Sequence, residues 1–291
     1  MCAAILICGT VLTSCTYEDN PAPSPADEVE EQLRKMTLRE KVGQLFFIRP
    51  EALDTTIHWK AYADLMPYEL QEVNDCMKGV NEKYPVGGII LYAWNIKDEV
   101  QLAQFLPQLK ALNGQPLMCI DEEGGRVARI ANNPKHFPGH GDTKADTHYG
   151  YAQTMKTWGE MLDCEIVTFR AGIQWGCELI MTAHISAPNV TGEDIPSTMS
   201  SVILQDKLRR ELGYQNIIVT DAMDMGAITQ QYTNAEATVG CILAGADIVL
   251  CPKDFVEAFE AVIDAIEKGT LTEERLNQSV RRILTIKQKR S

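Results

Sequence analysis

The segment from residue 135 to residue 148, KHFPGHGDTKADTH, concentrates residue types that can transfer protons or hold a ligand. It contains three of the chain's five histidines together with two aspartates. Pro138, Gly139 and Gly141 exclude both a regular helix and a central strand here. The segment is therefore predicted to be a loop that presents side chains, as catalytic loops on rigid scaffolds do. A solvated surface loop is the alternative interpretation.

Charged and titratable residues also follow three apolar runs of the sequence. Asp121, Glu122 and Glu123 come directly after QPLMCI, His184 ends LIMTAHI, and Asp221 follows NIIVT. If these runs are parallel strands, their carboxyl ends share one edge, which is where α/β folds bind ligands and where barrels place catalytic residues. His184 fits equally well as a residue that faces such a site or as a satisfied core histidine.

The apolar runs that must position these residues recur along the whole chain. Most are continuous rather than alternating, which suits parallel strands covered on both faces. The runs are 45–48, 86–93, 115–120, 177–185, 216–223 and 246–251, and stretches of helical length and amphipathic character lie at 29–44, 97–112, 151–175, 201–212, 232–244 and 254–268. This alternation predicts an α/β fold, either a barrel or a doubly wound sheet.

Composition limits the classes of function. The 291 residues, 45% hydrophobic and 23% charged, suit a globular chain with one large domain or two smaller ones. A net charge of −13 argues against a nucleic-acid partner, because phosphate binding needs a basic face. Neither GxGxxG nor GxxxxGK[ST] opens a predicted helix, so a nucleotide-binding fold has little support.

Cysteine spacing gives no indication of a metal site, because the chain has no CxxC or His-Cys pattern. Cys119, Cys177 and Cys251 lie in or beside apolar runs, as small buried hydrophobic residues often do. We therefore expect no metal and no disulfide framework.

The N-terminus has the pattern of an export signal. Residues 3–12 form an apolar run too short to span a bilayer, and LTSC at 12–15 resembles a bacterial lipobox in which Cys15 is lipidated. Pro21, Pro23 and Pro25 then favour a flexible tether. We expect a signal over 1–15, a tether over 16–28 and one catalytic domain over 29–291, in an exported protein anchored to the membrane only by lipid and facing the periplasm or the cell surface. A buried N-terminal helix is the alternative for the apolar run.

The loop at 135–148 resembles the signature loop of glycoside hydrolase family 3, in its β-N-acetylhexosaminidase branch. Other segments resemble the same family in the same order and extend the resemblance over nearly the whole predicted mature chain. They are MTLREKVGQLF (36–46), VGGIILYAWNI (86–96), IDEEGGRVARI (120–130), IIVTDAMDMGAI (217–228) and GTLTEERLNQSVRRILTIK (269–287), of which the last resembles the closing helix of the family.

The resemblance implies a (β/α)8 barrel that releases terminal β-linked N-acetylglucosamine with retention, through a glycosyl-enzyme and without a cofactor. It assigns Asp221 as the nucleophile and His148 with Asp146 as the acid/base dyad. The positions that match sugar-binding residues of the family are Asp121, Arg129, Lys135 and His136.

Elementary chemistry is consistent with these implied roles. Retaining hydrolysis needs a carboxylate to form the glycosyl-enzyme and a second group to protonate the leaving oxygen. An imidazole such as that of His148 titrates near neutrality, and Asp146 can fix its tautomer and stabilise its charged form. Lys135 and Arg129 can hydrogen-bond sugar hydroxyls, and their positive field favours an ionised Asp221. The structural alternatives are a helix N-cap for Asp221 and a loop pair for Asp146 and His148.

The sequence departs from the family at one place. Only Ala131, Asn132, Asn133 and Pro134 separate the DEEGGRVARI-like stretch from the KH loop, whereas a βα unit needs roughly 30 residues. Six strand runs are visible, so we expect two strands of the family's barrel to be absent. They are the fourth strand and the fifth strand, of which the fifth carries the loop matching 135–148 in the family. An arginine of the family's sugar site is expected to be absent with them. An incomplete gene model, a real deletion and a re-closed barrel all fit this gap.

Two other functions remain open. A β-glucosidase-like member of the superfamily usually takes its acid/base residue from a further domain, and the GHGDTKADTH loop argues against it. A lipid-tethered glycan-binding protein would bind sugar without turnover. Muropeptides, chitin fragments and host glycans are all consistent substrates.

Overall fold

A computed structural model of the chain describes residues 24–57, 70–120, 136–139 and 152–290. All six predicted strand runs form strands, and all of their pairings are parallel. The strands are β1 (Phe46–Ile48), β2 (Gly88–Leu91), β3 (Leu117–Ile120), β5 (Leu179–Thr182), β7 (Ile217–Thr220) and β8 (Val249–Leu250). Burial on both faces explains the continuous apolar sequences of β1, β2, β7 and β8.

The strands follow one another around the molecule in chain order. One sheet has the order β3-β2-β1-β8, and β7 pairs with β5. A parallel bridge between Val219 and Ile248 joins β7 to the segment that leads into β8. Because the first strand pairs with the last and the order never reverses, the fold is singly wound, and the doubly wound alternative is wrong. Within the described residues the strands do not close into a complete barrel, since β3 has a partner strand on one side only.

Phe137 extends the parallel arrangement beyond β5. It forms a parallel bridge with Thr182, its N–H donates to the Met181 carbonyl oxygen (2.8 Å), and its own carbonyl oxygen accepts from the Ala183 N–H (2.7 Å). The residue that follows His136 thus lies beside β5, at the position where the strand that carries the loop 135–148 is expected to be absent. One isolated bridge is not a strand, so within the described residues no strand takes this position. No described residue occupies the remaining position, between β3 and Phe137.

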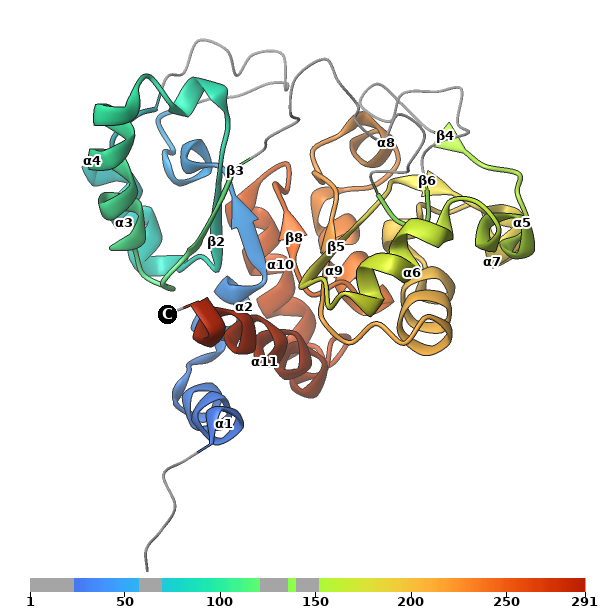
Figure 1. Ribbon diagram of the computed structural model, residues 1–291. Helices are drawn as coiled ribbons and strands as arrows, with labels where there is room; N and C mark the ends of the chain where they lie inside the picture. The colour runs from blue at the N-terminus through green and yellow to red at the C-terminus, as the bar shows by residue number, and fades with distance from the viewer. Residues whose placement is uncertain (1–23, 58–69, 121–135, 140–151, 291) are drawn as a thin grey trace, which may run out of the picture.

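Helices surround the strands, as the predicted alternation requires. They are α1 (Pro25–Lys35), α2 (Leu38–Gln44), α3 (Asp75–Lys83), α4 (Glu99–Lys110), α5 (Trp158–Leu162), α6 (Ile166–Gln174), α7 (Pro188–Thr191), α8 (Gly226–Thr229), α9 (Asn234–Ala244), α10 (Phe255–Glu267) and α11 (Glu273–Arg290). Short 3-10 helices lie at η1 (Pro50–Leu53), η3 (Ala93–Asn95) and η4 (Ser197–Met199), η5 (Val202–Glu211) is a π-helix, and two-residue strands β4 (Ala152–Gln153) and β6 (Ile185–Ser186) pair separately. Figure 1 shows α3 and α4 on one side of the molecule, and α5, α6 and α7 on the other.

Two predicted helical stretches are subdivided by local capping. The stretch 29–44 is two helices, because Thr37 caps α2 through a reciprocal pairing with Glu40. The stretch 151–175 contains β4, α5 and α6, with Thr157 capping α5 in the same way. Helix α1 begins at Pro25, within the residues expected to be a tether, because Ser24 caps it and proline is favoured in a first turn.

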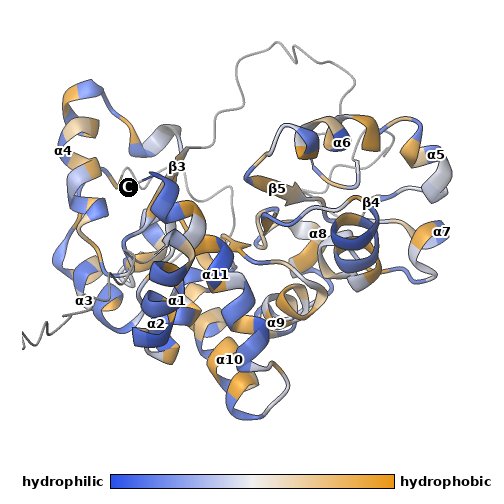
Figure 2. Cartoon of the chain, turned by 60° about the horizontal axis from the view of Figure 1, so that its bottom comes forward, coloured by the Kyte–Doolittle hydropathy of each residue, from blue (hydrophilic) through white to orange (hydrophobic). Residues whose placement is uncertain are grey.

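The core lies between the strands and the helices that cover them. Phe46 of β1 packs against Phe255 and Phe259 of α10, with ring centroids 5.5 and 5.8 Å apart. Each fully buried side chain of this size contributes roughly 1.5–3 kcal/mol. Figure 2 shows hydrophobic and hydrophilic residues side by side on α10, as expected for a helix with one buried face.

Candidate active site

Asp221 follows β7 at its carboxyl end and is firmly held by backbone groups. Its N–H donates to the Thr182 carbonyl oxygen (3.1 Å), and its Oδ1 accepts from the N–H of Ala222 (2.8 Å). The side chain is 14% exposed. One carboxylate oxygen is therefore fixed by the protein, while Oδ2 remains oriented toward His136.

His136 lies beside Asp221, with 3.4 Å between its Nε2 and Oδ2 of the aspartate. Its position is set by Phe137, which pairs with β5 and packs edge-on against Phe169 (5.2 Å) and Trp158 (6.4 Å). Nδ1 of His136 is buried and has no hydrogen-bond partner among the described residues. The structure thus brings together two residues that are 85 positions apart in the sequence and that were predicted to share a site.

Arg49 and Asp224 form a buried ion pair at the same edge, which sequence reasoning missed. Arg49 follows β1 and is 2% exposed, and its Nη2 lies 2.6 Å from Oδ2 of Asp224. The guanidinium also lies 5.4 Å from the ring centroid of Tyr92, which follows β2. A charged residue directly after the buried run LFFI was the available signal, since the ends of such strands meet at one edge.

Glu51 lies near this ion pair and accepts hydrogen bonds from two side chains that follow β2. It is fully buried, and its Oε1 accepts from Trp94 Nε1 (3.2 Å) and from Asn95 Nδ2 (2.5 Å). Burial raises the pKa of the Glu51 carboxyl, against the opposing effect of these hydrogen bonds. The Trp94 ring stacks on Tyr92, with centroids 4.7 Å apart.

His184 is a buried core histidine whose two ring nitrogens both have hydrogen-bond partners, rather than a residue that faces the site. It is fully buried, its Nδ1 lies 3.0 Å from Thr198 Oγ1, and its Nε2 lies 2.9 Å from the Ala222 carbonyl oxygen. Burial lowers the pKa of its imidazole. Its contact with Ala222 nevertheless connects it to the residue that follows Asp221.

Six of the predicted site residues fall outside the described residues, so the structure leaves those predictions as they were. They are Asp121, Arg129, Lys135, Asp146, His148 and the lipidation candidate Cys15.

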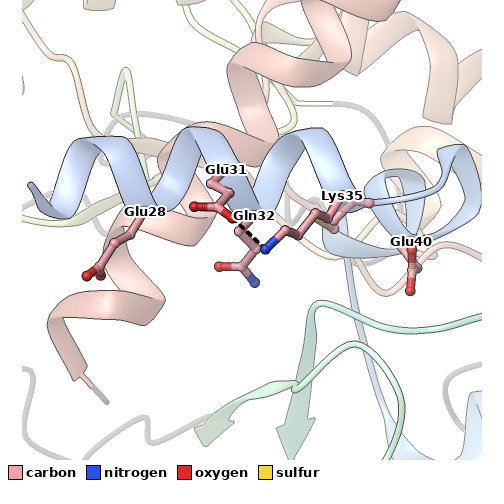
Figure 3. Close-up of a pocket in the computed structure, with 6 residues that line it drawn as sticks. Glu28, Glu31, Gln32, Lys35 and Glu40 are labelled. Carbon is pink, nitrogen blue, oxygen red and sulfur yellow. Dashed lines mark ion pairs between the residues drawn. The ribbon is translucent and has the colours of Figure 1, made fainter. Parts of the chain in front are cut away.

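Two hollows on the described surface are lined by residues other than Asp221 and His136. One lies on α1 and the start of α2, where Met36 and five charged or polar side chains line it, and Lys35 pairs with Glu31 there at 2.6 Å (Figure 3). Helix α1 lies at the opposite end of the molecule from α8, which follows Asp221 (Figure 1). The described residues contain no cluster suited to a metal ion and no helix of the length and apolarity that a membrane crossing requires, and their six cysteines are free.

The chain belongs to glycosyl hydrolase family 3, because the model of that family's N-terminal domain matches residues 128–286. Beta-hexosaminidase A of Pseudoalteromonas piscicida is 37% identical over 183 residues, which cover 56% of this chain and 31% of the relative. A beta-N-acetylglucosaminidase/beta-glucosidase of Cellulomonas fimi is 32% identical over 167 residues, covering 54% of this chain and 30% of the relative.

The fold is also similar to a solved structure of the same family. A beta-N-acetylglucosaminidase from Paenibacillus sp. str. FPU-7 superposes with a TM-score of 0.74 at 26% identity, covering 88% of this chain and 63% of the other. The chain therefore spans less than a third of the two curated relatives' length and somewhat less than two thirds of this structure.

Proposed function

We propose that the chain is a retaining glycoside hydrolase that releases terminal β-linked N-acetylglucosamine. The observation that carries this proposal is the approach of Asp221 Oδ2 to His136 Nε2 at 3.4 Å, where β7 and Phe137 flank the carboxyl end of β5. Family membership and the names of the relatives supply the reaction and the sugar. The finer fold in this proposal is a (β/α)8 barrel in which the position between β3 and Phe137 corresponds to the fourth strand.

The proposed reaction divides the chemistry between Asp221 and His148. Oδ2 of Asp221 attacks the anomeric carbon while the bond to the leaving oxygen breaks, and His148 protonates that oxygen. His148 then removes a proton from water, which displaces the carboxylate and releases the sugar with retained configuration. Asp146 orients the imidazole and balances its charge.

His136 supports sugar binding in this scheme. Because its ring lies against Oδ2 of Asp221, it is placed beside the sugar that the carboxylate attacks. Asp121, Arg129 and Lys135 are the other proposed sugar-binding residues, in keeping with the carbohydrate hydroxyls that carboxylates and cationic side chains can bind. No step requires a cofactor.

A chromogenic aryl β-N-acetylglucosaminide tests the activity, and a mechanism-based fluorinated glycoside tests the nucleophile. We expect release of the chromophore and a stoichiometric mass increase that maps to the peptide containing Asp221. Binding of N-acetylglucosamine without turnover would instead support the glycan-binding alternative. Release from the matching aryl β-glucoside at a comparable rate would favour the broader specificity that the Cellulomonas fimi relative's name describes.

We further propose that the protein is exported and anchored through Cys15, with residues 1–15 as the signal. The proposed tether from residue 16 ends at Ser24, which caps α1. Anchoring by lipoprotein processing supplies more than one acyl chain, which stable attachment needs. Cys15→Ser should release the protein from the membrane fraction or leave an unprocessed precursor; unchanged fractionation would refute the anchor.

A further inference from the structure

A chain of buried hydrogen bonds runs behind the proposed nucleophile. The hydroxyl oxygens of Thr182 and Thr198 lie 2.9 Å apart, Thr198 Oγ1 lies 3.0 Å from His184 Nδ1, and His184 Nε2 lies 2.9 Å from the Ala222 carbonyl oxygen. Thr182, His184 and Thr198 are all 0% exposed. This series of hydrogen bonds connects the end of β5, the helix η4 and the loop after β7.

The Ala222 carbonyl oxygen fixes the position of one proton in this series of hydrogen bonds. A carbonyl oxygen can only accept, so Nε2 of His184 carries the hydrogen that it donates to Ala222. Burial lowers the pKa of the ring, which favours its neutral form, and in that form Nδ1 can accept from the Thr198 hydroxyl. The Ala183 carbonyl oxygen, also 3.0 Å from Thr198 Oγ1, competes for that hydroxyl proton. The charged and titratable groups whose fields act on His184 are Asp221, His136 and Asp224.

The same backbone segment holds both residues of the proposed site. The carbonyl oxygen of Thr182 accepts from the Asp221 N–H, while Met181 and Ala183 pair with Phe137, the neighbour of His136. Ala222 follows Asp221; its N–H donates to Oδ1 of the aspartate, and its carbonyl oxygen accepts from His184 Nε2. A change at His184 is therefore transmitted to the Asp221 carboxylate through a single residue.

We propose that His184 is a positioning residue for Asp221: its neutral ring donates from Nε2 to the Ala222 carbonyl oxygen and so sets the direction of Oδ2. The inference rests on the proposed function, in which Asp221 is the nucleophile. His184 does not contact the substrate in this arrangement, because the ring is completely buried.

The tautomer can be measured without any turnover. In the full chain with 15N-labelled histidine, long-range 1H–15N spectra should show one imidazole that is in the neutral Nε2–H form at about pH 6.5, the ordinary pKa of histidine, and whose signals His184→Gln removes. Titration of that ring near its ordinary pKa, or an Nδ1–H form, would overturn the proposal. An inactive protein with the expected tautomer would contradict the proposed hydrolase and leave the hydrogen-bond assignment standing.

Kinetics test the positioning itself. His184→Leu removes the donor, and we expect kcat to fall by about 10²-fold with little change in KM, the scale of a misplaced reacting group. His184→Gln keeps an N–H near the Nε2 position and should recover most of the loss, and Thr198→Ser should retain more activity than Thr198→Val. Equal losses in His184→Leu and His184→Gln would make His184 a space-filling residue.

Ser197→Ala is the matched control, because Ser197 is a buried residue of η4 whose hydroxyl has no partner among the described residues. It should leave kcat unchanged. If His184→Leu does not melt cooperatively, the tautomer measurement and the comparison of Thr198→Val with Thr198→Ser test the positioning role of His184 instead. Equal kcat values in the two threonine variants would count against a role for the hydrogen bond between Thr198 and His184.

Discussion

Asp221 and His136 meet at 3.4 Å because both are aligned on the same short backbone segment at the end of β5. The Asp221 N–H donates a hydrogen bond to the Thr182 carbonyl oxygen. Phe137, which follows His136, forms backbone hydrogen bonds with the residues on either side of Thr182. The relative position of the two side chains therefore depends on strand pairing rather than on a flexible loop. Such backbone anchoring is what a reaction that needs two precisely placed groups requires.

Asp221→Asn tests the nucleophile with almost no change in shape. The amide keeps an acceptor for the Ala222 N–H but cannot form the glycosyl-enzyme, so kcat on an aryl β-N-acetylglucosaminide should fall by at least about 10³-fold. The melting temperature should stay close to that of the parent. Asp75→Asn is the control, because this aspartate side chain is 99% exposed. Retention of most activity by Asp221→Asn would eliminate the assignment.

His148→Ala tests the proposed acid. Turnover of glycans with alkoxide leaving groups should fall by about 10²-fold or more, which is the usual scale of general acid catalysis. Aryl glycosides with activated leaving groups need less protonation and should lose less. Steady-state kinetics on both kinds of substrate measure the difference, and equal losses would exclude His148 from this role.

Asp247 is expected to dominate the stability of the opposite end of the strands. Its side chain is 0% exposed. Oδ2 of Asp247 lies 2.5 Å from Nη2 of Arg209, and Oδ1 lies 2.8 Å from Nη1 of Arg282. Asp247→Asn leaves these cations without their counterion, which typically costs about 3–5 kcal/mol of unfolding free energy. Urea denaturation measures this loss.

The control for Asp247→Asn is Asp264→Asn. Asp264 lies on α10 and forms an exposed ion pair with Lys268, the residue at the C-terminal end of that helix. Exposed pairs contribute about 0–1 kcal/mol, so this variant should unfold near the parental midpoint. Similar losses in the two variants would show that the burial of Asp247 has no special effect on stability.

Lys287 gives the fold a pH dependence above neutrality. Its Nζ donates to Gln44 Oε1 (2.6 Å) and to the carbonyl oxygens of Gly114 and Gln115, and burial lowers its pKa to about 7, from 10.5 for a free lysine. Between these two values the unfolded chain binds more protons than the folded chain. The free energy of unfolding should therefore gain up to about 1.4 kcal/mol per pH unit from this residue as the pH rises through that window.

Lys287→Met should remove this contribution, which urea denaturation at several pH values between 7 and 10 can measure. Lys268→Met is the control, since Lys268 is 68% exposed. If the parent and Lys287→Met show the same pH slope, the ammonium group of Lys287 keeps its ordinary pKa in the fold.

The parts of the fold that could be predicted from the sequence are those with a local signature. Continuous apolar runs located all six strands, and the position of Asp221 after NIIVT correctly placed it at a strand end. The pairing of Phe137 was missed because one bridge has no periodicity to detect. Arg49 and Asp224 were missed as a pair because 175 positions separate them, and only the order of the strands brings them together. The break between α1 and α2 was recognisable in principle, since Thr37 and Glu40 have the spacing of a capping box.

The pairing of β1 with β8 has a consequence for the order of folding. Phe46 finds its partner Val249 only after nearly the whole chain has been synthesised, and α1 likewise depends on α11, where Arg281 pairs with Glu30. Closing so long a loop carries an entropic cost that must be met before these contacts stabilise anything. The N–H groups of Val249 and Cys251, which donate to the carbonyl oxygens of Leu45 and Phe47, should therefore be among the last to acquire protection against hydrogen exchange during refolding, and removal of α11 should expose residues near the start of the domain.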